Sequence, residues 1–172
     1  IYSYALFHDE NRKKAWEKSY GSVNLPVIAW EDAKVIVTLE SDLLGTDGMT
    51  MEQTRKFVDG RDVMKSNEFN RLYCVEGNMS LTGANADYRI RLNPGFQLEF
   101  VLALIDEIAG KLGTLNFLQG SASLGSIVEK FSLDRDILNH LVDDLLKNHG
   151  RSMVYAGSIL SEHIHIAVNY LN

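Results

Sequence analysis

Two glycines lie in a short turn that directly follows a strongly apolar run, in the segment Asp42-Leu43-Leu44-Gly45-Thr46-Asp47-Gly48. Backbone N–H groups of such a turn can approach a phosphate closely, which makes Gly45, Thr46 and Gly48 candidate ligand contacts. The segment does not match the GxGxxG pattern and has no P-loop lysine. The glycines would equally suit a turn that needs positive φ angles, so both interpretations stay open.

Other residue types that often perform chemistry are sparse. The single cysteine, Cys74, lies within an apolar run and is expected to be a small buried hydrophobe rather than a nucleophile. One cysteine excludes an intramolecular disulfide and an all-cysteine iron–sulfur site. His163 and His165 are two residues apart on a predicted helix, so they point in different directions and make a poor metal site. We therefore predict no catalytic residue and no metal ligand.

The composition is that of an ordered globular chain of 172 residues, with 45% apolar and 23% charged residues, which suits one large domain. The net charge of -6 contains no basic block, which argues against nucleic-acid binding. No apolar stretch reaches the ~20 residues of a membrane span. Because the chain opens on Ile1 in a strand-like pattern, we expect residues 1–172 to be one domain excised from a longer chain.

Short apolar runs alternate with amphipathic segments along the whole chain, which is typical of βαβ units. This rhythm predicts an α/β fold, a doubly wound, Rossmann-like parallel sheet with helices on both faces. The strand carrying Arg89 and Arg91 alternates charged and apolar residues, which predicts an edge or rim position. The expected strands are Tyr2–Phe7, Val35–Leu39, Leu72–Glu76, Tyr88–Leu92 and Ser152–Ala156.

Helix boundaries are predicted from capping residues. Thr50 should be the N-cap of a capping box whose helix runs towards Val63. Gly113 to Gly125 is glycine- and serine-rich and is interpreted as a connection. The expected helices are Asp9–Tyr20, Thr50–Val63, Gly95–Leu112 with Pro94 in its first turn, Leu133–Asn148, and a last helix capped by Ser161.

The segment Leu72 to Gln97 resembles a signature of the molybdopterin oxidoreductase family, in which a strand ends in Asp-Pro-Arg and Thr-x-Thr-Ala-x-x-Ala-Asp follows. Ser80 and Thr82 fall on the two threonines, and Asp87 falls on the final Asp. Gly95 belongs to the Pro-Gly that opens the next helix. The resemblance is closest to one branch, the molybdopterin-like domain of the iron–sulfur subunit of alternative complex III, a quinol:cytochrome c oxidoreductase. It covers roughly residues 30–106 and implies a site built from Gly45, Thr46, Gly48, Glu76, Asn78, Ser80, Thr82, Asp87, Gly95 and Gln97.

The departures from the family pattern bear on cofactor binding. Glu76-Gly77-Asn78 replaces Asp-Pro-Arg, and Gln97 replaces an Asp whose carboxylate could accept two N–H bonds from a guanine edge. The resemblance therefore implies a scaffold domain without a molybdenum cofactor and without activity of its own. Iron–sulfur clusters are expected only in the rest of the parent protein. The alternative is a domain that binds part of a molybdopterin guanine dinucleotide in an active molybdoenzyme.

The same resemblance implies the surroundings of the domain. Its partners would be other domains and subunits of a membrane-attached respiratory complex, on the periplasmic side of a bacterial inner membrane. A ligand, if one binds, is expected in a crevice formed by Leu44–Gly48, Glu76–Asn78 and Gly95–Gln97, because open α/β sheets bind ligands outside the carboxyl ends of their strands.

Overall fold

The fold is described by a computed structural model that covers residues 8–64, 69–117 and 122–172. Its strands are β1 (Val35–Leu39), β2 (Arg71–Glu76), β3 (Tyr88–Arg91) and β4 (Ser152–Ala156). The helices are α1 (Glu10–Tyr20), α2 (Thr50–Asp59), α3 (Leu81–Ala84), α4 (Gln97–Leu112), α5 (Leu124–Phe131), α6 (Arg135–Lys147) and α7 (Glu162–Leu171), with a 3-10 turn, η1 (Pro94–Phe96), before α4.

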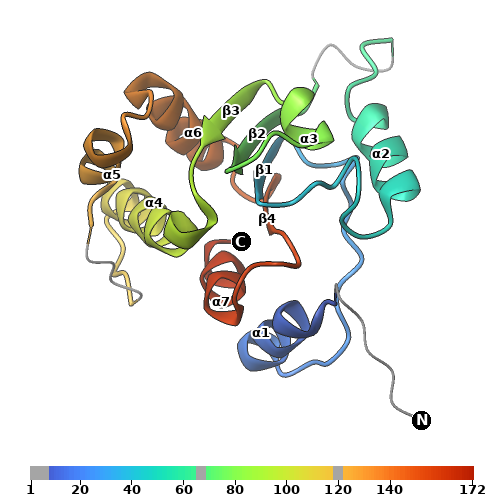
Figure 1. Cartoon of the computed structure of the whole chain (residues 1–172), viewed down its shortest axis with the longest axis horizontal. Helices are drawn as coiled ribbons and strands as arrows, with labels where there is room; N and C mark the ends of the chain where they lie inside the picture. The colour runs from blue at the N-terminus through green and yellow to red at the C-terminus, as the bar shows by residue number, and fades with distance from the viewer. Residues whose placement is uncertain (1–7, 65–68, 118–121) are drawn as a thin grey trace.

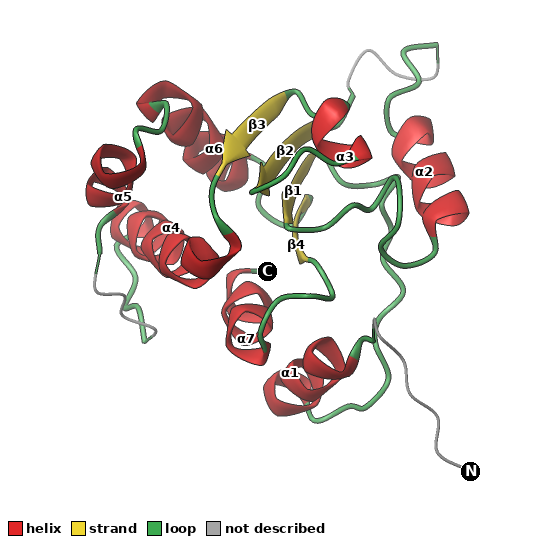
Figure 2. Cartoon of the chain, viewed as in Figure 1, coloured by secondary structure: helices red, strands yellow, loops and turns green. Residues whose placement is uncertain are grey.

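The four described strands form one parallel sheet in the order β3-β2-β1-β4 (Figure 2). Every residue of β1 is buried, as expected for a central strand covered on both faces. From β1 the chain adds β2 and β3 on one side and then returns to place β4 on the other side. The topological switch point therefore lies between β1 and β4, and the carboxyl ends of all four strands share one edge of the sheet.

Helices cover both faces of this sheet, as Figure 1 shows. One face packs Val37, Leu39 and Tyr73 against apolar residues of α4, α5, α6 and α7. The opposite face packs Ile36 and Leu72 against Phe57 of α2 and Trp30 of the segment before β1. Helix α1 lies outside these layers, against α7. The expected Rossmann-like α/β fold is confirmed, as is the edge position of the arginine-bearing strand β3.

Four of the five expected strands are present, and the fifth, Tyr2–Phe7, lies outside the described residues. Two short helices, α3 and α5, were not predicted, and α5 begins inside the expected connection Gly113–Gly125. The prediction of a capping box with Thr50 as N-cap is wrong. Thr50 is the first helical residue of α2, and its Oγ1 donates to Gly45 O at 3.2 Å, while Met49 at the N-cap makes no side-chain cap. This helix also ends at Asp59, before Val63.

Cys74 lies in the middle of β2 and is fully buried. Burial raises the pKa of its thiol to about 12, against an ordinary value of 9.0, so at pH 8 its thiolate fraction is roughly 1,000-fold below that of an exposed thiol. We expect the native chain to resist the thiol reagent DTNB and to react with one equivalent in urea. Reaction of native protein within minutes at pH 8 would show that β2 is accessible.

Candidate functional site

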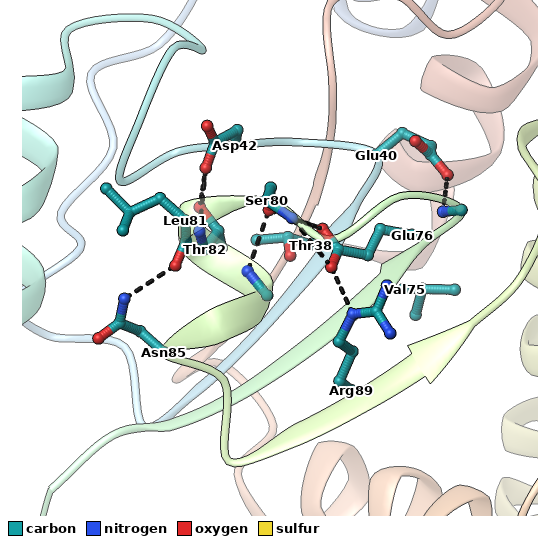
Figure 3. A network of polar contacts seen from close by, with 12 residues as sticks. Thr38, Glu40, Asp42, Val75, Glu76, Ser80, Leu81, Thr82, Asn85 and Arg89 are labelled. Atoms are coloured by element: carbon teal, nitrogen blue, oxygen red, sulfur yellow. Dashed lines mark hydrogen bonds and ion pairs between the residues drawn. The ribbon is translucent and has the colours of Figure 1, made fainter.

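The carboxyl ends of β1 and β2 carry the acidic side chains of the candidate site. Glu76, the last residue of β2, is only 3% exposed. Its carboxylate accepts a hydrogen bond from Ser80 Oγ at 2.6 Å and from Arg89 Nε at 2.5 Å, as Figure 3 shows. Burial raises the pKa of this carboxyl, but the bonds from Ser80 and Arg89 outweigh burial, and the pKa lies below its ordinary value. Glu76 is therefore held as a paired, charged group.

Helix α3 closes over this carboxylate. Ser80 is its N-cap, and Ser80 Oγ accepts the N–H of Gly83 at 3.0 Å. A Cβ on Gly83 would lie 1.9 Å from Glu76 Oε1. Glycine at this position lets the backbone of α3 sit directly on the Glu76 carboxylate, and any larger residue would force that carboxylate to move.

A second carboxylate ties the turn after β1 to the same helix. Asp42 Oδ1 accepts bonds from both N and Oγ1 of Thr82, each at 2.9 Å. Thr82 is fully buried, and its Oγ1 also accepts the N–H of Leu44 at 3.0 Å. A Cβ on Gly45 would lie 2.0 Å from Asp42 Oδ2, so this glycine also allows a close approach of the protein's own carboxylate.

Glu40, the residue after β1, is held in a left-handed conformation with φ 46°, which is uncommon for a side chain of this kind. Its Oε1 accepts the N–H of Gly77 at 2.6 Å and Nε2 of Gln97 at 3.3 Å. Burial raises the pKa of the Glu40 carboxyl, and the negative charge of Glu76 raises it further. The bonds from Gly77 and Gln97 offset only part of this. Glu40 thus links the ends of β1 and β2 to the start of α4.

Gln97 is fully buried at the start of α4, so it faces protein and not solvent. Besides Glu40, its Nε2 donates to Val75 O at 3.2 Å, and its Oε1 has no hydrogen-bond partner within the described part of the chain. The position that carries an Asp in the resembled family is therefore used here to join two strands to a helix.

The structure brings together Glu76, Ser80, Thr82, Gln97 and Gly45 of the predicted site. Thr46 and Asn78 are exposed at the rim, as are Gly48, whose φ is +81°, and Gly95. The positive φ favours the structural interpretation of Gly48.

Asp87 was misplaced by sequence reasoning. It directly precedes β3 and so lies at the amino end of the sheet, away from the other site residues. There its carboxylate accepts the N–H of Leu72 at 2.8 Å and pairs with Arg61. The expected crevice also does not lie at the topological switch point. Its segments follow β1, β2 and β3, whereas the switch point lies between β1 and β4.

Three residues of the cluster were not predicted: Glu40, Asp42 and Arg89. The position of Glu40 and Asp42 just after a buried strand was a usable signal, since such residues meet at the carboxyl edge of a parallel sheet. The role of Arg89 was harder to predict from the sequence. Its place in a strand of alternating charged and apolar residues predicts an exposed side chain, not an ion pair with a buried carboxylate.

The switch point itself is closed by backbone. Gly157 follows β4, and a Cβ at this position would lie 1.9 Å from Glu40 O and 2.6 Å from Glu40 C. Gly157 N also donates to Leu39 O at 2.8 Å. The segments after β1 and β4 therefore touch where an open crevice would separate them.

The cluster offers little to a metal ion or to an anion. Within residues 8–64, 69–117 and 122–172, no group of three or more His, Cys, Asp or Glu side chains is placed to hold a metal. The cluster holds three carboxylates, those of Glu40, Asp42 and Glu76, and among the described residues Arg89 is the one guanidinium that bonds to any of them. Within the cluster itself the balance of charge is negative, which disfavours a phosphate.

None of the described helices combines the length and apolar character needed to cross a bilayer.

Comparison with models of known protein families finds no match to this chain, and comparison with curated proteins finds no significant match either.

Proposed function

We propose that this domain is a scaffold of a molybdopterin-family oxidoreductase subunit and binds no molybdopterin cofactor itself. The observation that carries the proposal is that the polar groups at the carboxyl ends of β1 and β2 bond to one another. Glu76 is paired with Arg89 and Ser80, and Asp42 with Thr82. A cofactor-binding domain would keep such groups available for its ligand.

The same geometry opposes the alternative, a site for part of a molybdopterin guanine dinucleotide. A guanine base has donor N–H groups that need an accessible carboxylate, but Glu76 is 3% exposed and already accepts several bonds. A pyrophosphate would meet the net negative charge of the cluster. Opening the cluster would break charge-assisted hydrogen bonds, each worth about 1.5–3 kcal/mol.

Exposed apolar side chains beside the cluster support a role in packing against other proteins. Met49 and Met51 at the start of α2 are 74% and 89% exposed, and Met79 and Leu81 at the start of α3 are 69% and 53% exposed. Thr50 Oγ1 donates to Gly45 O and Thr82 Oγ1 accepts the N–H of Leu44, so these two helix starts lie around the same turn after β1. Flexible methionines are common at surfaces that bind other proteins.

The proposed partners are the other domains and subunits of a membrane-attached respiratory electron-transfer complex, with the iron–sulfur clusters in the rest of the parent protein. The parent would lie on the periplasmic side of a bacterial inner membrane. These statements rest on the resemblance of residues 30–106 to the molybdopterin family.

The test is a metal and nucleotide analysis of the complete parent protein, purified with its partners. We expect iron, no stoichiometric molybdenum, and no GMP released by acid hydrolysis. Calorimetric titration of this domain with GDP should likewise show no binding up to millimolar concentrations. About one molybdenum per parent, or micromolar GDP binding that is lost in a Thr46→Trp variant at the exposed rim, would replace the scaffold proposal by the cofactor-binding one.

A further inference from the structure

The two outer strands of the sheet, β3 and β4, differ in how their outward backbone groups are bonded. At β4, Asn172 Oδ1 accepts the N–H of Val154 and Asn172 Nδ2 donates to Val154 O, each at 2.9 Å. Arg12 Nη2 donates to Ala156 O of the same strand at 2.8 Å. Side chains of the protein itself therefore cover the edge at β4. On the outer side of β3, none of the described residues bonds to the backbone in this way.

The hydrogen bonds between β3 and β2 show which groups of β3 face outward. Leu92, just after β3, donates its N–H to Glu76 O at 3.1 Å. Successive residues of a strand direct their backbone groups to opposite sides, so Ile90 also faces β2. The N–H and C=O groups of Arg89 and Arg91 therefore point away from the sheet. Such a row of groups is a template on which another strand can pair.

A hollow of about 300 Å³ lies along this edge. Arg89, Ile90 and Arg91 form one wall, and the turn between α5 and α6, with Ile137 of α6, forms the other wall. Figure 1 shows α5 and α6 on the side of the sheet that ends in β3. A partner must fit between a strand edge and a helical turn, which favours one extended segment over the edge of a second sheet.

The two faces of an added segment would meet different surroundings. The side chain of Ile90 lies in the main core, and Leu133 and Ile137 of the opposite wall pack against the same core. Because side chains alternate along a strand, Arg89 and Arg91 lie on the other face of β3. A segment paired with β3 therefore meets apolar side chains on one face and guanidinium groups on the other.

The charge at this edge favours an acidic partner. Arg91 is exposed and forms no ion pair within the described part of the chain. Arg89 contacts Glu76 through Nε. Asp134 also lines the hollow, but it is the N-cap of α6, and its Oδ1 accepts the N–H of Asp136 at 2.9 Å. A carboxylate on the added segment can form a charge-assisted hydrogen bond with Arg91.

A second copy of this chain is a poor partner for the same edge. Pairing β3 with β3 of another copy would place Arg89 and Arg91 beside the same arginines of the other strand. Like charges opposite one another destabilise a pair of strands. The charge pattern of β3 thus opposes self-pairing and leaves the edge to a strand of opposite charge.

We propose that β3 binds an extended segment of a partner protein in which acidic and apolar residues alternate, and that this segment adds a strand to the sheet. Its carboxylates pair with Arg91, and its apolar side chains pack on Leu133 and Ile137. The proposal names a class of partner for the scaffold proposed above and rests on it in that respect. The two can fail separately, because peptide binding at β3 does not bear on the molybdenum and GMP content of the parent.

The test uses two peptides, acetylated and amidated at their ends, on the unmodified chain at pH 7: Ser-Val-Glu-Val-Glu-Val-Ser and Ser-Val-Lys-Val-Lys-Val-Ser. We expect the glutamate peptide to bind at least about tenfold more tightly in calorimetry, as one charge-assisted hydrogen bond allows. Hydrogen exchange followed by NMR reports the pairing directly. With the glutamate peptide at ten times its Kd, exchange at the amides of Arg89 and Arg91 should slow by roughly tenfold, while that of Ile90 is protected with or without peptide.

A matched pair of charge reversals locates the site. Arg91→Glu should reverse the preference in favour of the lysine peptide, whereas Arg55→Glu, at an exposed position on α2, should leave it unchanged. If Arg91→Glu does not fold, the exchange measurement on the unmodified chain still decides. Equal affinity for the two peptides overturns the proposal, as does unchanged exchange at Arg89 and Arg91 with millimolar glutamate peptide. Protection of these amides that grows with protein concentration in the absence of peptide would assign the edge to a second copy and overturn it too.

Discussion

Replacing Gly157 by Ala should destabilise this domain by about 3 kcal/mol or more, because overpacking against rigid groups costs 1–3 kcal/mol and occasionally more. The added Cβ would lie 1.9 Å from Glu40 O, 2.6 Å from Glu40 C and 3.1 Å from Ser41 Cα. All three are backbone atoms, so no side-chain rotation relieves the clash. The segments after β1 and β4 would have to separate, and Glu40 already has a positive φ. Urea denaturation followed by circular dichroism measures the loss.

Gly110→Ala is the matched control for this substitution. Gly110 lies in the last turns of α4, is exposed, and a Cβ there would meet nothing within 4 Å. Alanine favours a helix over glycine by up to about 1 kcal/mol, so this variant should be slightly stabilised. If Gly157→Ala were as stable as Gly110→Ala, the segments after β1 and β4 would not be in contact in solution.

Most of the sheet could be predicted from the sequence because β1, β2 and β4 are largely apolar runs and β3 alternates charged and apolar residues. The run Val35–Leu39 becomes β1 with every residue buried, and Ser152–Ala156 becomes β4. Short elements could not be predicted in this way. Helix α3 is four residues long, too short for a helical period, and depends on the side-chain cap by Ser80.

The candidate site was predicted in part for a related reason. Position at or just after the carboxyl end of a strand correctly placed Glu76 and the turn containing Gly45 at one edge of the sheet. Sequence alone could not show that these groups would bond to each other, because that depends on where α3 packs. Asp87 belonged to the same motif in sequence, but it precedes a strand instead of following one, and so it lies at the opposite end.

The ion pair between Glu76 and Arg89 should be the most costly polar contact to break. The side chain of Glu76 is 3% exposed and that of Arg89 is 24% exposed. Replacing Arg89 by Met would leave a buried carboxylate without its counter-charge, and breaking such a pair from one side costs about 3–5 kcal/mol. We expect a loss of that order at pH 7 in the free energy of unfolding. Arg91→Met, at an exposed position on the same strand, should cost less than about 0.5 kcal/mol.

The pH dependence and a double variant test the mechanism of this loss. The folded-state pKa of Glu76 lies below the ordinary value of 4.5, so its contribution to stability is present above that value and is lost as the pH falls through the folded pKa. In Arg89→Met this carboxyl loses a bond that lowers its pKa, so it should be protonated more easily, and the deficit relative to the unmodified chain should shrink as the pH falls through the variant's folded-state pKa towards that of the unmodified chain. The double variant Glu76→Gln with Arg89→Met removes the buried charge as well, so it should be more stable than Arg89→Met alone. A deficit that stays constant from pH 7 to pH 3.5, or a double variant no more stable than the single one, would show that Arg89 acts through packing and not through the charge of Glu76.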